Sequence, residues 1–351
     1  MKILILGVNG FIGHALLRRI LQHTSWEVAG LDVGDDRVCA LAGSPRFRFV
    51  RADIRKHRRR IEQLVADADV VIPLAAFTRP ADYVRDPLAT FELDFEENLR
   101  TVRAAVRTDT RVLFPSTSEV YGLCEDERFN EETSRLVVGP IAKERWMYSC
   151  SKQLLDRVIW AYGRRGLRFT IFRPFNWFGP NLDDVRQSAP GSARVVTQFI
   201  GHLMRREPIP LVDGGRQRRT FTYVDDGVDA LMRIIANEDG RANAAIFNLG
   251  NPANDVSIRE LAELLIAKLA RFPGFAAAAA AARLEEVSAE RYYGPAYQDV
   301  PRRAPDITAA RTQLGWEPRV PLRLGLRRTL AYYAEDASPA RAYGTAGSSE
   351  R

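Results

Sequence analysis

Cysteine, histidine and long apolar stretches are all scarce in this sequence of 351 residues. Its three cysteines, Cys39, Cys124 and Cys150, show no C-x-x-C spacing, so we expect reduced thiols in a cytoplasmic protein. The four histidines occur singly, none at metal-ligand spacing, so no metal site is expected. No uninterrupted apolar run is long enough to span a bilayer, which argues against a membrane protein.

The positive charge of the chain is moderate, +7, and comes mainly from arginine. The densest basic run is RKHRRR at residues 55–60. Such a run can bind nucleic acid, but no aromatic residues interleave with it and no nucleic-acid motif accompanies it. We interpret it as the solvated face of a helix and expect no nucleic-acid partner. The excess positive charge can still attract an anionic substrate.

Short apolar runs alternate with helical patterns through the first half of the chain. Strands are predicted at 2–6, 27–32, 47–50, 69–74, 111–114 and 168–173. Helices are predicted at 14–23, 91–106 and 149–162. Strands without polar alternation are typical of a sheet that is buried on both faces. The alternation predicts an α/β protein with a Rossmann-type doubly wound parallel sheet and a smaller C-terminal substrate-binding lobe.

The domain organisation follows from a change of character after Pro174. Residues 1–175 are expected to form an NAD-binding Rossmann domain that carries the catalytic residues. Residues 176–335 are expected to form mainly the substrate-binding lobe, with some segments returning to the Rossmann domain. This part holds a loop at 178–193, a helix at 258–270 and a polyalanine run at 276–282. Residues 336–351 are small and polar, which predicts a flexible tail.

A dinucleotide site is predicted where the first strand meets the first helix. Gly7, Gly10 and Gly13 follow G-x-x-G-x-x-G, and Phe11 and Ile12 lie between the last two glycines. Glycines allow the tight turn and let a pyrophosphate approach the backbone N–H groups at the helix N-terminus.

Acidic residues after the next two strands indicate which dinucleotide binds. Asp32 ends the second strand, where a carboxylate accepts hydrogen bonds from ribose hydroxyls and repels a 2′-phosphate, so NAD is favoured over NADP. Asp53 and Ile54 follow the third strand and can reach adenine, although a solvated turn aspartate is an equal alternative there.

The candidate catalytic residues are a tyrosine–lysine pair and a hydroxyl-rich segment. Tyr148 and Lys152 are spaced i and i+4 on one helix, where an ammonium group would lower the pKa of the phenol and make it a base. Thr117, Ser118 and Glu119 follow a predicted strand, so they should gather at the ligand-binding edge of the sheet. The hydroxyls can hydrogen-bond a reacting sugar hydroxyl, and Glu119 adds a carboxylate beside it.

These motifs together resemble the extended short-chain dehydrogenase/reductases. Longer stretches are more closely similar to the UDP-glucuronate decarboxylase domains of bifunctional polymyxin-resistance proteins. They are ILGVNGFIG, FELDFEENLR, FPSTSEVYG, YSCSKQLLDRVIWAYG, FRPFNWFGP and YYGPAYQDV. The resemblance runs from Met1 to about residue 335, without a counterpart of the formyltransferase domain, so a stand-alone enzyme is expected.

The resemblance implies a reaction and residues for it. Oxidation at C4 of UDP-glucuronate places a ketone beta to the carboxylate, and a beta-keto acid loses carbon dioxide readily. Glu119 and Arg303 match the catalytic glutamate and arginine of those enzymes. Arginine suits binding of a carboxylate or enolate. Because its pKa is too high for a ready proton donor, we expect a bound water to deliver the proton beside Arg303.

The resemblance also implies residues that bind the UDP-sugar. They are Thr78, Tyr83, Thr117, Ser118, Arg145, Asn176, Arg218, Arg219 and Tyr297. Arg218 or Arg219 is expected to clamp the diphosphate. Thr78 departs from the alanine expected in those domains, and it is the residue that would alter the pocket near the sugar. A homodimer or higher homo-oligomer is expected through helices 91–106 and 149–162.

Three alternatives remain open at this stage. A UDP-sugar 4-epimerase usually lacks a glutamate at position 119, and a nucleotide-sugar 4,6-dehydratase typically has Asp-Glu after the threonine. A non-catalytic NAD-binding regulatory protein is disfavoured by the intact Tyr148, Lys152 and glycines. The expected product is UDP-4-keto-pentose, UDP-xylose or both, according to the relative rates of release and reduction of the 4-keto intermediate.

Overall fold

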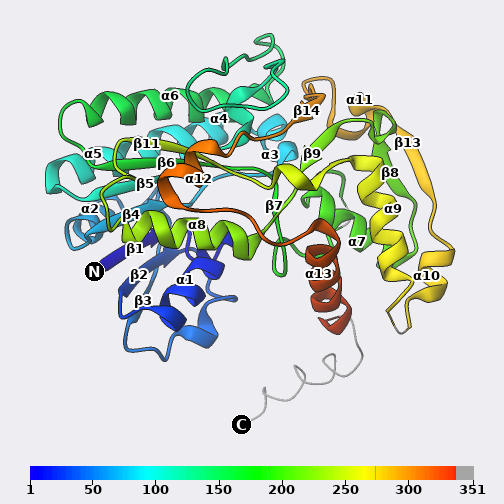
Figure 1. Ribbon diagram of the computed structural model, residues 1–351, viewed down its shortest axis with the longest axis horizontal. Coiled ribbons are helices and arrows are strands. Elements are labelled where there is room, and N and C mark those ends of the chain that lie inside the picture. The colour runs from blue at the N-terminus through cyan, green and yellow to red at the C-terminus, as the bar shows by residue number, and fades with distance from the viewer. Residues whose placement is uncertain (188, 273, 337–351) are drawn as a thin grey trace.

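The computed structural model describes residues 1–187, 189–272 and 274–336 (Figure 1). Its main sheet has seven parallel strands in the order β11-β6-β5-β4-β1-β2-β3. The strands are β1 Lys2–Leu6, β2 Glu27–Asp32, β3 Phe47–Arg51, β4 Val70–Pro73, β5 Arg111–Pro115, β6 Phe169–Pro174 and β11 Ala245–Leu249. The order reverses between β1 and β4, which confirms the Rossmann-type doubly wound sheet.

Helices cover both faces of this sheet. One face carries α1 Phe11–His23, α8 Val224–Ala236 and α12 Thr308–Leu314. The other carries α2 Arg58–Ala66, α5 Asn98–Thr108 and α6 Trp146–Gly163. Along β1, Ile3 and Ile5 belong to the core under α1, whereas Leu4 and Leu6 belong to the core under α2 and α5. The strand is apolar throughout because alternate side chains enter two separate cores.

The remaining elements form a smaller lobe on the right of Figure 1. Its strands are β7 Trp177–Phe178, β8 Ile209–Val212, β9 Arg218–Thr220, β10 Thr222–Tyr223, β12 Asp255–Ser257, β13 Leu284–Val287 and β14 Arg302–Arg303. Its helices are α7 Val195–Arg205, α9 Ile258–Leu269, α10 Ala276–Ala280, α11 Ala289–Tyr293 and α13 Leu322–Asp336. The chain enters the lobe after β6 and returns to the main sheet with α8 and β11.

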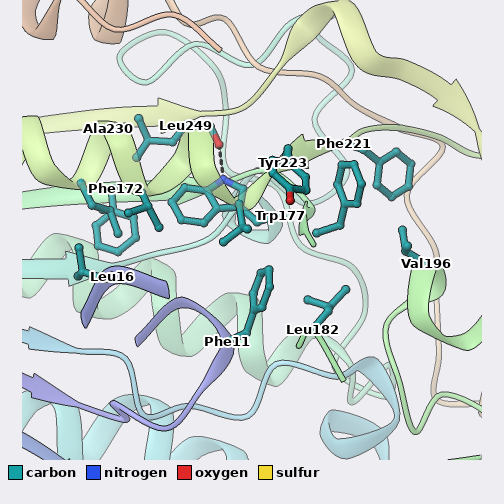
Figure 2. Close-up of a cluster of buried hydrophobic side chains, with 14 of the residues drawn as sticks. Phe11, Leu16, Phe172, Trp177, Leu182, Val196, Phe221, Tyr223, Ala230 and Leu249 are labelled. Atoms are coloured by element: carbon teal, nitrogen blue, oxygen red, sulfur yellow. Dashed lines mark hydrogen bonds between the residues drawn. The ribbon is translucent and has the colours of Figure 1, made fainter. Parts of the chain in front are cut away.

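Trp177 joins the lobe to the sheet (Figure 2). Its indole N–H donates to the carbonyl of Leu249 at 2.8 Å, and its ring packs against Phe172 at a centroid distance of 6.5 Å. A Cβ atom on Gly227 of α8 would lie 2.4 Å from the ring, so only glycine fits beneath it. Trp177 belongs to a cluster of buried hydrophobic side chains that also includes Phe11 of α1 and Phe221 of the lobe, so one core spans both parts.

The helix predicted at 91–106 differs from the observed one. The chain forms α4 Pro87–Phe91, a π-helical segment η2 Glu92–Glu97 and then α5. The wider turn leaves carbonyl groups short of partners, and the side-chain amide of Asn98 donates to the carbonyls of Leu93 (3.1 Å) and Asp94 (3.2 Å). A π-helical turn contains one residue more than an α-helical turn, and the spacing of apolar residues alone does not reveal it.

Other predicted segments can be placed directly. The helix expected at 258–270 is α9, which begins after a capping box formed by Ser257 and Glu260. Part of the polyalanine run forms α10, and no helix or strand lies between β7 and α7 in the described part of the loop at 178–193. Of the expected tail at 336–351, only Asp336 is described. No described helix combines the length and apolar character needed to cross a membrane.

Candidate active site

A cavity of about 450 Å³ lies at the carboxyl ends of the central strands, between the sheet and the lobe. The sheet side of its wall includes Gly7, Gly10, Phe11, Ile12, Gly13, Thr117, Ser118, Glu119, Tyr148 and Lys152. The remaining wall includes Thr78, Tyr83, Asn176, Arg219, Tyr297 and Arg303. Tertiary folding therefore brings together most of the residues that sequence motifs had pointed to, from segments far apart in the chain.

The glycine turn forms one end of the cavity. Gly7 has a φ of +90°, and a Cβ atom there would lie 2.7 Å from the backbone nitrogen of Ala75. A Cβ atom on Gly13 would lie 2.4 Å from the carbonyl oxygen of Gly7. No side chain caps the N-terminus of α1 at Gly10, so the first N–H groups of this helix face the cavity end without a side-chain acceptor. This cradle suits a dinucleotide pyrophosphate.

The carboxylates expected at the adenosine end occupy different surroundings. Asp32 accepts the backbone N–H groups of Asn9 (2.9 Å) and Val33 (2.7 Å), and burial raises its pKa. Asp53 pairs with Arg55, and Ile54 is buried in the hydrophobic core. None of the three forms part of the cavity wall, so their contact with adenosine stays a prediction.

Tyr148 and Lys152 lie on α6 at the middle of the cavity. The Lys152 ammonium donates to the carbonyl of Pro115 at 3.0 Å and lies 5.9 Å from the centroid of the Tyr148 ring. Tyr83 stacks on Tyr148 with a centroid distance of 4.5 Å and an interplanar angle of 4°. Both side chains of the pair are almost completely buried, so their geometry is set by the packing around them.

Burial decides the protonation of this pair. It raises the pKa of the Tyr148 phenol, the Asp94 carboxylate adds to the rise, and a hydrogen bond with Thr117 opposes it. Burial also lowers the pKa of Lys152, which the Asp94 carboxylate opposes. Any lowering of the phenol pKa by Lys152 works against this rise, and that role of the lysine stays a prediction.

Hydrogen bonds at the end of β5 hold the hydroxyl-rich segment around Thr117 in place. Thr117 caps the short helix η3 Ser118–Tyr121, with its hydroxyl accepting the N–H of Glu119 at 3.2 Å. Ser116 donates to Asp156 of α6 at 2.8 Å, and Arg173 of β6 donates to the same carboxylate at 3.1 Å. These buried contacts fasten the end of β5 to α6, which sets Thr117 and Ser118 beside Tyr148.

Glu119 lies between two arginines. It accepts hydrogen bonds from Arg145 and from Arg303. Burial alone would raise the pKa of Glu119, but the two guanidinium groups hold it at about 2. Arg145 also donates to the carbonyl of Gln298 at 2.7 Å and does not reach the cavity wall. Arg145 contacts Glu119 directly, and its predicted contact with the substrate stays a prediction.

Only one of the two arginines proposed for the diphosphate faces the cavity. Arg219 is in the wall and donates to Asp299 at 2.6 Å. Arg218 points away, where its guanidinium contacts Asp255 and Glu260, each at 3.3 Å. Neighbouring residues of a strand face opposite sides, so Arg218 is not placed to clamp the diphosphate and Arg219 remains the candidate.

The other expected substrate residues line the wall in different ways. Tyr297 stacks on Tyr293 at a centroid distance of 4.1 Å. Asn176 has a φ of +39°, and its amide donates to the carbonyl of Thr220 at 2.9 Å. Thr78 lies in the wall near the turn after β4.

Among the residues that sequence reasoning missed are Tyr293 and Asp299 in the cavity wall and Asp94 beside Lys152. Asp94 carries a detectable signal, because it is an acidic residue among the apolar positions of a helical stretch. Tyr293 and Asp299 lie within the quoted YYGPAYQDV stretch, but nothing in their spacing indicates the groups that they contact.

A glycine cradle at the first βα turn and a buried Tyr–Lys pair in one cavity define a Rossmann-fold oxidoreductase of the short-chain dehydrogenase/reductase type. The chain belongs to the NAD dependent epimerase/dehydratase family, whose family model matches residues 3–250. This is the extended branch of those enzymes, and its cofactor is NAD.

Solved structures of other proteins are similar over nearly the whole chain. PbgP3 protein from Burkholderia pseudomallei is 49% identical, with 97% of this chain and 98% of that chain covered and a TM-score of 0.88. The UDP-glucose 4-epimerase from Thermotoga maritima is 24% identical, with 96% and 100% covered and a TM-score of 0.79. The UDP-glucuronic acid 4-epimerase from Bacillus cereus, in complex with UDP-glucuronic acid and NAD, is 22% identical, with 95% and 99% covered and a TM-score of 0.78. The two epimerases share the fold.

Proposed function

We propose that this enzyme catalyses the NAD-dependent oxidative decarboxylation of UDP-glucuronate. The observation that carries the proposal is Glu119 held between Arg145 and Arg303 in the same site as Tyr148 and Lys152. A Tyr–Lys pair is enough to oxidise a hydroxyl. The added guanidinium at the cavity wall gives a carboxylate on the substrate a charged partner.

The proposed substrate class is a UDP-sugar. Structural relatives include enzymes named for UDP-glucose and UDP-glucuronic acid, and the latter was solved with that ligand. The cavity offers Arg219 for a diphosphate, Asn176 for polar groups and the stacked ring of Tyr297 for an apolar face. This combination suits a ligand with both anionic and planar parts.

The first step is oxidation at C4 of the sugar. Tyr148 accepts the C4 hydroxyl proton, with Thr117 and Ser118 positioned to orient that hydroxyl. Bound NAD supplies the hydride acceptor, and the Gly7–Gly13 turn is suited to hold its pyrophosphate. Because burial raises the pKa of Tyr148, the positive charge of Lys152 is needed to make the phenolate accessible.

The second step is loss of carbon dioxide. The ketone at C4 is beta to the carboxylate, so the bond between C5 and C6 breaks and its electron pair remains as an enolate. Arg303 is placed to bind the carboxylate before this step and the enolate charge after it. A water beside Arg303 is proposed to return a proton to C5, since the guanidinium itself has too high a pKa to donate readily. The product is UDP-4-keto-pentose, or UDP-xylose if reduction precedes release.

A homodimer or higher homo-oligomer in the cytoplasm is part of the proposal. Apolar side chains are exposed on α4 and α6, where Leu88 is 68%, Leu154 49% and Trp160 43% exposed. These helices lie along one side of the sheet (Figure 1) and offer a surface for a second copy. The three cysteines are free, as suits a reducing compartment.

The test is incubation of the pure protein with UDP-glucuronate and NAD. NADH absorbance, carbon dioxide and product mass are followed together. We expect carbon dioxide release with formation of UDP-4-keto-pentose, UDP-xylose or both. A product that retains the carboxylate with inverted C4 would identify a 4-epimerase instead, and a product that lacks one water would identify a dehydratase. A protein that binds NAD but turns over none of the UDP-sugars tested would favour a regulatory role.

A further inference from the structure

Asp94 is a completely buried carboxylate next to the Tyr–Lys pair, and the proposed mechanism does not use it. Its Oδ2 accepts the backbone N–H of Phe77 at 3.1 Å. Its Oδ1 has no hydrogen-bond partner within the described part of the chain and lies 3.6 Å from the Lys152 nitrogen. This distance permits a strong ion pair but exceeds a hydrogen bond. Asp94 does not line the cavity, so it acts through Lys152 rather than on a ligand.

The local structure is built to hold Asp94 in this position. It lies in the π-helical segment η2, which inserts an extra residue between α4 and α5. The side-chain amide of Asn98 donates hydrogen bonds to the carbonyls of Leu93 and Asp94. These bonds replace backbone hydrogen bonds that the wide turn cannot form. Through Phe77, the Asp94 carboxylate also anchors the turn after β4, where Ala76 and Thr78 line the cavity.

The charges around Lys152 leave Asp94 as its available counter-ion. Two carboxylates face the ammonium, Asp94 and Asp156. Asp156 already accepts hydrogen bonds from Arg173 and from Ser116, so its charge is matched elsewhere. Other groups that act on Asp94 or on the phenol of Tyr148 are Glu119 of η3, Tyr83 of α3 (Pro80–Arg85) and Arg194, which precedes α7 and lowers the pKa of the phenol. Glu119 is neutralised by its own arginines.

We infer that Asp94 is the buried counter-ion that keeps Lys152 charged, and is therefore a positioning residue for the Tyr148–Lys152 pair. A buried ammonium without an anion would release its proton, and the nicotinamide of an oxidised dinucleotide would bring a second positive charge into the same cavity. The titration directions agree with this geometry. Burial raises the pKa of Asp94 to about 7 with Lys152 opposing, and burial lowers the pKa of Lys152 with Asp94 opposing.

The first experiment needs neither substrate nor cofactor, so its outcome does not depend on the proposed function. The chain has only five lysines, which makes their side-chain nitrogens resolvable by NMR in protein labelled with 15N-lysine. The Lys152 signal is assigned from its absence in Lys152→Met. In Asp94→Asn, which preserves the acceptor for Phe77, we expect the Lys152 titration midpoint to fall by about one pH unit or more. Asp67→Asn removes an exposed carboxylate at the end of α2, outside the cavity wall, and should leave the Lys152 midpoint unchanged. An equal midpoint in Asp94→Asn and wild type would overturn the inference.

The second experiment measures catalysis and rests on the proposed function. We expect both limbs of the kcat profile of Asp94→Asn to move to lower pH. The basic limb moves because Lys152 loses its counter-ion, and the acidic limb because the phenol no longer faces an anion. A lower kcat without a shift along the pH axis would reduce Asp94 to an anchor for Phe77. If neither protein oxidises UDP-glucuronate, the proposed function fails while the NMR result still decides the ion pair.

A double variant keeps the inference testable should Asp94→Asn fold poorly. Lys152→Met leaves Asp94 buried and unpaired, so its melting temperature should fall. Adding Asp94→Asn in that background should restore part of the loss, because both charges are then removed. A double variant less stable than Lys152→Met would contradict the pairing.

Discussion

Arg303 donates a hydrogen bond to Glu119 across 184 residues of sequence. Arg145 binds the other carboxylate oxygen of Glu119, so the two guanidinium groups and one carboxylate leave a net positive charge beside the cavity. Under the proposed function, this surplus charge serves the substrate carboxylate, which oxidation of a hydroxyl alone would not require. The interaction also links the lobe to the sheet, because Arg303 lies in β14 and Glu119 follows β5.

The Glu119 interaction should make stability depend on pH. The pKa of Glu119 falls from 4.5 to about 2 on folding, so its contribution is complete above pH 4.5 and is lost as pH decreases towards 2. We expect Glu119→Gln to lose about 3–5 kcal/mol of unfolding free energy at pH 7, since two buried arginines lose their partner. Urea unfolding from pH 7 to pH 3 measures the difference, which should shrink below pH 4.5. A difference that stays constant across this range would argue against the assignment.

Replacement of Arg303 should separate the two proposed steps. In Arg303→Ala, we expect carbon dioxide release to fall about 10²–10³-fold, the cost typical of removing one stabilising donor from a charged transition state. Glu119 keeps its contact with Arg145, so the fold should persist. Single-turnover measurement of NADH beside carbon dioxide reports oxidation and decarboxylation separately. Decarboxylation at the wild-type rate would eliminate any role for Arg303.

Tyr148→Phe should remove the proposed base and leave the packing intact. Phenylalanine can keep the stacked contact with Tyr83, which lies at a centroid distance of 4.5 Å in the wild type. We expect kcat for oxidation to fall about 10²–10⁴-fold, with little change in UDP-sugar binding by calorimetry. Strong residual oxidation would point to another base.

The neighbouring arginines of β9 offer a matched pair of variants. Arg219 lines the cavity, whereas Arg218 contacts Asp255 and Glu260 on the other side of the strand. We expect Arg219→Ala to raise the KM for a UDP-sugar at least tenfold, as about 1.4 kcal/mol corresponds to one decade. Arg218→Ala should change it little. Equal effects from both variants would contradict the observed orientation.

The glycine cradle can be tested with a control elsewhere in the chain. A Cβ atom on Gly13 would lie 2.4 Å from the carbonyl of Gly7, whereas one on Gly43 meets no atom within 4 Å. Gly13→Ala should therefore abolish the rise in melting temperature that NAD causes in the wild type, and Gly43→Ala should preserve it. Retention of the NAD effect in Gly13→Ala would place the dinucleotide elsewhere.

Much of the fold could be predicted because it is encoded over short distances. Apolar runs mark strands buried on both faces, and the glycine spacing marks the turn between β1 and α1. The i, i+4 spacing places Tyr148 and Lys152 on one helix face, which the structure confirms. The π-helical turn at Glu92–Glu97 was not predicted, because it depends on Asn98 reaching back to two carbonyls.

The sequence by itself determined the Rossmann half, the dinucleotide turn and the presence of a Tyr–Lys pair. Tertiary structure alone decided that Glu119 lies between Arg145 and Arg303, that Arg219 rather than Arg218 faces the cavity, and that Asp94 lies beside Lys152. The physical reason is that periodicity reports only local neighbours. Which distant side chains meet, and how burial shifts their pKa values, depends on the packing of the sheet against the lobe.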